Sequence, residues 1–342
     1  MRRKKLKTSN IVLTGGGTGG HLAIVNEMKK ELNSRGIKPI FVGSANGQDK
    51  SWFENDPNFE ACYFLQSRGV MNKGLIGKVM SLISIIILAF KMGAIFKKHN
   101  ISKVFSVGGY SAAPASFGAI IYFKNLFIHE QNAKMGVLNK VLSVFSKNIF
   151  SSYSINATDY PVGENYFNTA RTRKDVKTII FLGGSQGAKN INNFALQIAR
   201  DLTSKGIKII HQTGKNDFER VVQEYKKLQI QADVFAFHNE LFLKMADSDL
   251  AISRAGASTT WELCANGLPC IFVPYPFAAS NHQYFNAKFF SDKKLGFLVP
   301  DGELQNFKID KILNKNIQQI SSKLQKLIKL GGAKTMASEM LK

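Results

Sequence analysis

A glycine-rich run, GGGTGGH at residues 15–21, separates a short apolar segment from a helical pattern. Five of its seven residues lack a side chain, and Gly15, Gly17 and Gly20 fit the spacing G-x-G-x-x-G. Glycines let a phosphate approach the main chain, and the free N–H groups at a helix start bind anions. The run therefore predicts an anion site, and a tight turn without a ligand is the alternative.

The residues around this run argue against two common nucleotide sites. An NAD site needs an acidic residue at the end of the second strand, but that strand ends FVGSANG at 41–47. A Walker loop needs Lys-Ser or Lys-Thr after the glycines, and His21 and Leu22 stand there instead. A phosphate bound here would belong to another kind of ligand.

His21 ends the glycine run where the predicted helix begins. The positive end of a helix dipole disfavours a protonated imidazole, which suits a proton acceptor. A histidine beside an anion site can act as a base or orient the reacting group. A structural histidine is the alternative interpretation.

A second polar cluster, HEQN at 129–132, follows the apolar residues LFI. Polar residues at the carboxyl end of a parallel strand lie where open α/β sheets bind ligands. Glu130 either takes part in such a site or caps the next helix.

The stretch ISRAGASTTWELCANGLPCIFVPYP at 252–276 contains a strand that ends near Arg254 and a helix that begins after Gly256. Glu262 lies one turn inside that helix, and its carboxylate can accept hydrogen bonds from both hydroxyls of a ribose. A surface glutamate placed favourably against the helix dipole is the alternative.

A second glycine loop, GGSQGAK at 183–189, follows another apolar strand and adds the hydrogen-bonding side chains Ser185 and Gln186. One such loop in each half of the chain predicts two phosphorylated ligands. This favours a transferase over a dehydrogenase.

The elements that position these residues share one order: an apolar strand, a glycine cluster and a helical pattern. This order recurs after the strands predicted at 10–14, 103–107 and 177–182. Strands alternating with helices predict an α/β fold with parallel sheets covered on both faces. The polar stretch at 156–165 divides the chain into two doubly wound, Rossmann-like domains. Near the C-terminus an amphipathic helix is predicted from Ile317, Ile320, Leu324, Leu327 and Leu330.

The composition and charge limit the classes of partner that the protein can have. The 342 residues are 44% apolar and 20% charged, which is a globular composition with room for two cores. A net charge of +22 implies nucleic acid, an acidic membrane surface or phosphorylated substrates. The basic residues are scattered and form no stripe interleaved with aromatic residues, which argues against nucleic acid. Cysteines without CxxC spacing favour a reducing compartment, and the basic start lacks the apolar region of a signal peptide.

The segment at 75–98, LIGKVMSLISIIILAFKMGAIFKK, is unusually apolar. Its uninterrupted apolar part, Leu82 to Phe90, is well short of the roughly 20 residues that span a bilayer. It is flanked by Lys73, Lys78, Lys97 and Lys98. The segment is either a buried core helix or an apolar patch, ringed by lysines, that lies on an anionic leaflet without crossing it.

Seven motifs in this order resemble the MurG family of glycosyltransferases: GGGTGGH, GGY with a proline after it, HEQN, GGSQGAK, SRAG with a later T..E, GLP..FVPYP and HQ..NA. The likeness extends from about Asn10 to Val299. It implies a GT-B fold, in which two Rossmann-like domains face each other across a cleft. The implied domains are 1–162 for the acceptor and membrane, 163–325 for the nucleotide sugar, and 326–342 as a helix returning to the first domain.

The resemblance also implies an activity. Members of this family move N-acetylglucosamine from UDP-GlcNAc to the C4 hydroxyl of the muramoyl sugar in undecaprenyl-pyrophosphoryl-MurNAc-pentapeptide (lipid I), with inversion, and so make lipid II for peptidoglycan. A related GT-B enzyme that glycosylates another lipid, such as diacylglycerol, is the alternative.

The resemblance places the protein at the cytoplasmic face of the bacterial inner membrane, bound peripherally to its anionic surface. It allows further partners among proteins of cell-wall synthesis or cell division and implies no nucleic acid. No DxD-like carboxylate pair is apparent, so we expect neither a metal nor a cofactor.

Site roles follow from the motifs that match. His21 and Glu130 are the implied catalytic residues, His21 as the base or its partner. The donor is expected to contact Thr18, Gly19, Gly20, Asn132, Ser185, Gln186, His238, Ala257, Ser258, Thr259, Glu262 and Gln283. The acceptor is expected to contact Gly16, Gly17, Gly109, Tyr110 and His129.

For five residues of the donor set, the resemblance also implies which part of the donor they contact. Ser185 and Gln186 are expected at the diphosphate, and the main chain of His238 at the uracil. Glu262 is expected at the ribose and Gln283 at the sugar hydroxyls.

One position departs from the family pattern. Family members commonly carry an arginine after a Pro-Val pair at the domain junction, but here Gly163 follows Val162. Either another cation, Arg171 or Arg173, replaces it, or donor binding is weaker.

Overall fold

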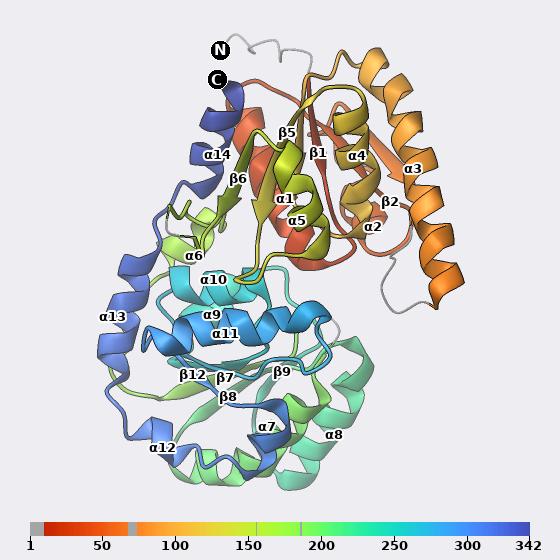
Figure 1. Cartoon of the computed structure of the whole chain (residues 1–342). Helices are drawn as coiled ribbons and strands as arrows, with labels where there is room; N and C mark the ends of the chain where they lie inside the picture. Colours follow the sequence, from red (N-terminus) through yellow and green to blue (C-terminus); the bar gives the residue numbers. More distant parts are fainter. Residues whose placement is uncertain (1–9, 68–73, 155, 185–186) are drawn as a thin grey trace. The chain divides into compact units, whose positions relative to one another are not determined.

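The computed structural model describes residues 10–67, 74–154, 156–184 and 187–342. The chain forms two compact units (Figure 1). The first contains the chain up to Pro161 together with Gly331–Lys342, and the second contains Val162–Leu330. The boundaries expected from the sequence, after residues 162 and 325, lie close to these.

The first unit contains a six-stranded parallel sheet in the order β3-β2-β1-β4-β5-β6. The strands are β1 (Ile11–Thr14), β2 (Ile40–Ser44), β3 (Ala61–Leu65), β4 (Lys103–Ser106), β5 (Asn125–Glu130) and β6 (Asn148–Ser151). The helices are α1 (Gly19–Ser34), α2 (Asp49–Phe53), α3 (Leu75–Lys98), η1 (Tyr110–Ala112), α4 (Ala113–Ile121), α5 (Val137–Leu142), η2 (Ser143–Phe145) and α14 (Gly332–Leu341).

The second unit repeats this topology in the order β12-β11-β10-β7-β8-β9, again with parallel strands. Its strands are β7 (Thr178–Leu182), β8 (Lys208–Gln212), β9 (Asp233–Phe235), β10 (Leu250–Ser253), β11 (Cys270–Phe272) and β12 (Phe297–Leu298). Its helices are α6 (Glu164–Asn168), α7 (Lys189–Ser204), η3 (Lys215–Asp217), α8 (Phe218–Leu228), α9 (Leu241–Ala246), α10 (Ala257–Ala265), η4 (Ala279–Asn281), α11 (His282–Asp292), η5 (Asp301–Asn306), α12 (Asp310–Leu313) and α13 (Ile317–Leu327). The predicted α/β fold with two doubly wound sheets is confirmed.

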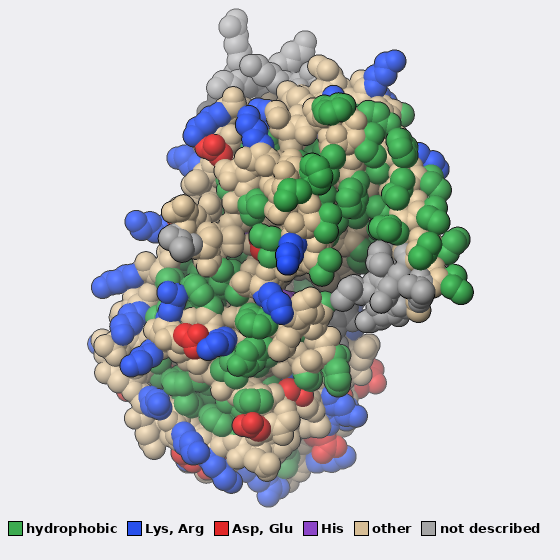
Figure 2. Space-filling view, in the orientation of Figure 1, with side chains coloured by type: hydrophobic (Ala, Val, Ile, Leu, Met, Phe, Trp, Pro, Cys, Tyr) green, Lys and Arg blue, Asp and Glu red, His purple; other side chains and the backbone are tan. Residues whose placement is uncertain are grey.

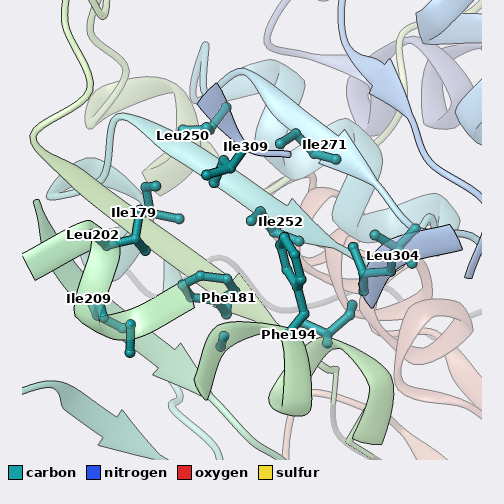
Figure 3. Close-up of a cluster of buried hydrophobic side chains, with 14 of the residues drawn as sticks. Ile179, Phe181, Phe194, Leu202, Ile209, Leu250, Ile252, Ile271, Leu304 and Ile309 are labelled. Atoms are coloured by element: carbon teal, nitrogen blue, oxygen red, sulfur yellow. The ribbon is translucent and has the colours of Figure 1, made fainter. Parts of the chain in front are cut away.

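The central strands are largely apolar because parallel sheets are covered on both faces. Every residue of β1 and β7 is buried. In the second unit, strand side chains such as Phe181 and Ile252 meet Phe194 of α7 in one buried cluster (Figure 3). In the first unit, a corresponding cluster joins the sheet to α3 and α4. These two cores hold the carboxyl ends of the strands in place.

Helix α3 has one buried face and one exposed face. The buried face contains Ile85, Ala89, Met92 and Phe96, which recur at helical spacing and pack toward α4. The opposite face exposes large apolar side chains: Ile76, Val79, Met80, Leu82, Ile83, Ile86, Ile87 and Phe90. Figure 2 shows hydrophobic side chains gathered along this helix. The segment is therefore a core helix on one face and an exposed apolar patch on the other, and the contact of that patch with a membrane stays a prediction.

The end of the chain forms two helices. The predicted amphipathic pattern belongs to α13, which ends at Leu327, before Leu330. After Gly331, α14 packs with α1 in the first unit and buries Met336, Ala337 and Met340. The Arg35 guanidinium of α1's C-cap donates to the Lys334 carbonyl and to the Ser338 hydroxyl, both at 2.9 Å.

Candidate active site

In each unit the strand order places candidate residues at the carboxyl ends of the strands, where the order changes direction. The order changes direction between β1 and β4 and between β7 and β10. Open α/β sheets bind ligands outside the carboxyl ends of the strands at such switch points. The first glycine run follows β1, GGY follows β4, and the segment 254–262 follows β10.

The first three glycines of the run are required by the protein's own packing. A Cβ on Gly15 would lie 2.2 Å from Val107 Cγ2, on Gly16 2.3 Å from Asp49 Oδ1, and on Gly17 2.7 Å from Tyr110 Cε1. The Gly17 N–H also donates to Asp49 Oδ1. An internal carboxylate therefore occupies the place next to Gly16 and Gly17 that the sequence interpretation gave to a ligand. Acceptor contact at Gly16 and Gly17 stays a prediction.

Gly19 lies at the start of α1 and has more room. The nearest atoms to a Cβ there would be Gln48 Oε1 at 3.5 Å and a Trp52 ring atom at 3.8 Å. Thr18, the exposed N-cap residue, makes no side-chain cap hydrogen bond. Of these positions, Gly19 is the one that a ligand can approach most closely.

The His21 ring is held from both sides. Its Nδ1 lies 2.8 Å from the Thr18 hydroxyl, and its Nε2 lies 2.7 Å from the amide nitrogen of Gln131. With the Gln131 amide nitrogen as donor, Nε2 accepts and Nδ1 carries the proton of the neutral ring; with the amide turned over, the two ring nitrogens exchange these roles. In the first arrangement Nε2 already accepts from Gln131, so it must release that hydrogen bond before it can take a proton from a substrate. Gln131 belongs to HEQN, but the sequence interpretation gave it no role.

Glu130 is buried at the end of β5 and shapes the loop that follows. Its Oε1 accepts from the Asn132 N–H at 2.9 Å. Its Oε2 accepts from the N–H of Gly136, the N-cap residue of α5, and from the Asn139 amide, both at 2.9 Å. These contacts correspond to the capping alternative for Glu130, and a catalytic role remains a prediction.

His129 has no exposed surface, and its ring meets the Tyr160 ring edge-on, with centroids 5.3 Å apart. Burial, together with the charge of His21, lowers the pKa of His129 to about 3. The ring is therefore neutral at pH 7. Any contact with an acceptor would need its surroundings to open.

Tyr110 contacts the glycine run and the loop after β2. Its ring packs against Gly17, and its hydroxyl donates to the Asn46 carbonyl at 2.8 Å. Gly109, just before it, has φ +78 and lies close to the His21 ring. Both residues thus line the His21 side of the switch point.

In the second unit, Gly256 is the N-cap of α10, and a Cβ built on it would meet nothing within 4 Å. Its φ of −65 is open to any residue. Neither packing nor backbone conformation therefore requires glycine, and a ligand at this helix start would explain it. Ala257 and Ser258 are mostly buried behind it, whereas Thr259 and Glu262 are half-buried.

The remaining donor candidates lie on neighbouring loops. Ser185 and Gln186 lie outside the described residues. His238 is half-buried, and its Nδ1 accepts from the Glu240 N–H at 3.1 Å. The side-chain oxygen of Gln283 accepts from the Tyr275 N–H at 2.9 Å, which holds the loop after β11.

Arg173 has no free guanidinium group for a donor diphosphate. It is fully buried and donates to the carbonyls of Met245, Ser248 and Asn266, and burial lowers its pKa to about 9. Arg171 donates to the Ala246 and Ser248 carbonyls and pairs with Asp249, but its side chain is 42% exposed. Replacement of the junction arginine by Arg171 stays a prediction.

The sequence interpretation missed Asp49 and Gln131. Gln131 could have been found from its place inside HEQN. Asp49 carries no such signal, because its importance comes from a contact across 32 positions. Among the described residues, no group of three or more His, Cys, Asp or Glu side chains could hold a metal ion.

Two family models match the chain. The N-terminal domain of glycosyltransferase family 28 matches residues 11–151, and the C-terminal domain of that family matches residues 178–339. Together the two models reach from β1 to α14.

Named relatives match over nearly the whole chain. A Campylobacter fetus protein named UDP-N-acetylglucosamine–N-acetylmuramyl-(pentapeptide) pyrophosphoryl-undecaprenol N-acetylglucosamine transferase is 52% identical over 333 residues, covering 97% of this chain and 99% of its own. A Helicobacter pylori protein of the same name is 48% identical, covering 96% and 98%.

Solved structures show the same fold. The crystal structure of Acinetobacter baumannii MurG has a TM-score of 0.78 and 24% identity, covering 97% of this chain and 98% of that one. A UDP-glucose:anthocyanidin 3-O-glucosyltransferase has a TM-score of 0.65 at 9% identity, covering 98% of each chain. The fold is GT-B, and with both domain models and relatives of this identity, the chain belongs to glycosyltransferase family 28.

Proposed function

We propose that the protein transfers N-acetylglucosamine from UDP-GlcNAc to the C4 hydroxyl of the muramoyl sugar in lipid I, with inversion, to give lipid II. The observation that carries this is the 52% identity, over 97% of the chain, with a relative named for this transfer. The names of the relatives give no support to diacylglycerol as the acceptor.

In the proposed reaction the C4 oxygen attacks the anomeric carbon of the donor sugar. The bond from that carbon to the UDP phosphate oxygen breaks, and the hydroxyl proton passes to His21 Nε2. The contacts with Thr18 and Gln131 support this role by holding the imidazole in place, and Nε2 takes the proton after it releases the Gln131 amide. A positioned base typically contributes about 10²–10⁴-fold to the rate.

The donor is proposed to bind the second unit at the switch point between β7 and β10. The open space at Gly256 supports a nucleotide at the start of α10, with Glu262 on the ribose. Main-chain N–H groups of the loop after β7 would stabilise the departing diphosphate, since preorganised donors are effective where charge develops.

The exposed face of α3 is proposed to lie on an anionic membrane, where the lipid acceptor resides. By length and composition the segment Val79–Lys98 could cross a bilayer, and 33% of it is buried in the structure. Its buried face is committed to α4, which supports lying on the membrane rather than crossing it. Lys97 and Lys98 at its end would meet the lipid phosphates.

The test is transfer of labelled N-acetylglucosamine from UDP-GlcNAc to lipid I, with diacylglycerol as the competing acceptor in a parallel reaction. We expect labelled lipid II and no labelled glycolipid. Labelling of diacylglycerol alone would replace the proposed acceptor, and no transfer to either lipid would overturn the proposal.

A further inference from the structure

The carboxylate of Asp49 is buried beneath the first glycine loop. Asp49 is the first residue of α2, and its side chain has no exposed surface. Its Oδ1 accepts from the Gly17 N–H at 2.5 Å, and its Oδ2 accepts from the Ser44 N–H at 2.8 Å. Burial raises the pKa of this carboxyl, and the two N–H donors act in the opposite direction by favouring its charged form.

Two glycines make room for this carboxylate. A Cβ on Gly16 would lie 2.3 Å from Asp49 Oδ1, and a Cβ on Gly43 would lie 2.5 Å from Phe41 Cε1 and 2.8 Å from Asp49 Oδ2. Neither Gly16 nor Gly43 has a positive φ, so backbone conformation does not require glycine at either position. A larger residue at Gly16 would displace Asp49, and one at Gly43 would displace the Phe41 ring as well as Asp49. The end of β2 and the glycine loop are thus built around one side chain.

The same loop is held at a second point. The ring of Tyr110 packs against Gly17 from η1, and its hydroxyl bonds to Asn46, three residues before Asp49. Gly17 is therefore fixed by its N–H on Asp49 and by its contact with the Tyr110 ring. Its φ of +81 is in the left-handed region and turns the chain between β1 and α1.

The position of Gly17 sets the position of His21. Thr18 follows directly as the N-cap of α1, and its hydroxyl contacts His21 Nδ1 at 2.8 Å. A shift of Gly17 would move this hydroxyl and release one of the two contacts that orient the imidazole. A misplacement of about 1 Å can cost about 10²-fold in rate.

We propose that Asp49 is a positioning residue: its carboxylate fixes Gly17 and, through Thr18, the ring of His21. A carboxylate suits this task because each of its oxygens accepts a different main-chain N–H. An asparagine has only one accepting oxygen, so its NH₂ group would face one of the two N–H donors. The catalytic consequence of this arrangement rests on the proposed function.

The experiment compares Asp49→Asn with Glu54→Gln, which removes an exposed carboxylate that pairs with Lys50 at the end of the same helix. For Asp49→Asn we expect kcat to fall about 10²-fold. The affinity for UDP, which is proposed to bind the second unit, should be unchanged, and amide exchange over residues 11–22 should be faster. Glu54→Gln should match the wild type in all three. A purely stabilising role would lower Tm and leave kcat unchanged well below Tm.

The two proposals fail in different ways. If the wild type transfers no sugar to lipid I, the proposed function fails, and amide exchange still decides whether Asp49 holds the loop. If Asp49→Asn keeps the wild-type kcat and exchange, the positioning role is wrong. Should that variant not fold, Asp49→Ser replaces it, since a serine hydroxyl is a single, shorter acceptor that cannot bind both main-chain N–H groups. It should show the same loss of kcat, and a wild-type kcat would contradict the proposal.

Discussion

Gly15, Gly16 and Gly17 are glycines because side chains of the same unit fill the space where a Cβ would lie. Gly19 and Gly256 differ, since a Cβ there would meet nothing closer than 3.5 Å. At the scale of single residues, ligand approach is therefore expected at the starts of α1 and α10. The bends of the loop before α1 serve the protein's own packing.

His21 is the residue on which the proposed chemistry depends. We expect His21→Ala to lower kcat by about 10²–10⁴-fold, because the variant loses the positioned base proposed to accept the hydroxyl proton. The KM for UDP-GlcNAc should change little, since a base acts mainly in the transition state. Steady-state kinetics with lipid I and UDP-GlcNAc measures both quantities.

His99→Ala is the matched control for His21. His99 follows α3, where its ring bonds to Tyr63 at 2.7 Å and to Glu60 at 3.0 Å, away from the switch point. We expect an unchanged kcat for this variant. A raised donor KM with normal kcat in His21→Ala would instead make His21 a binding residue.

Helix α3 combines two environments because its apolar residues continue around the helix. The face on α4 is part of the core, and the other face remains exposed although its side chains are large and apolar. Soluble proteins rarely expose contiguous apolar surface of this kind without a partner. At the scale of elements, α3 therefore stabilises the first unit with one face, and its other face is the one proposed to contact a membrane.

Replacing exposed residues of α3 should separate these two roles. We expect Ile83→Ser, Ile86→Ser and Phe90→Ser together to weaken binding to phosphatidylglycerol vesicles by about 10²-fold or more. Each side chain contributes roughly 1.5–3 kcal/mol when buried in an apolar phase. Co-sedimentation measures the binding, and thermal denaturation should show an unchanged fold.

The control carries serine at three exposed apolar positions of the second unit, Leu243, Phe277 and Leu330. It should bind vesicles like the wild type. Equal losses in both variants would show that no particular face meets the membrane. Unfolding of the α3 variant would assign these residues to the core.

At the scale of the whole molecule, the same sheet topology occurs twice, and each unit buries one neutral histidine. His129 lies in the first unit and His211 in the second, and burial lowers the pKa of each to about 3. His211 is also held by Tyr225 and Asn192, each at 3.0 Å. Both units are therefore expected to be sensitive to acid.

The sign of this sensitivity follows from the protons bound. Between about pH 6.5 and pH 3 the unfolded histidine binds a proton that the folded one does not. As the pH is lowered through this range, the free energy of unfolding should therefore fall by about 1.4 kcal/mol per pH unit for each histidine. Urea denaturation at pH 7 and pH 5 measures the fall, and His129→Phe should show a smaller one. If the free energy of unfolding falls equally in the wild type and in His129→Phe, His129 does not contribute to the acid sensitivity.

The sequence by itself determined the strands, the glycine loops and the family, because these depend on local patterns. An apolar run such as NIVLT before glycines favours a buried strand that ends in a turn, and its alternation with helical patterns predicts parallel pairing. The order of the motifs similarly identified the transferase family.

Only the tertiary structure decided what each glycine and each charged side chain does. Asp49 reaches Gly17 across 32 positions, and Arg173 reaches Asn266 across 93, so neither contact leaves a local pattern. The four hydrogen bonds that Glu130 accepts show that it holds the loop before α5, which its place in HEQN did not reveal, and its catalytic role stays a prediction. The physical reason is that packing and hydrogen bonding act between residues that only the fold brings together.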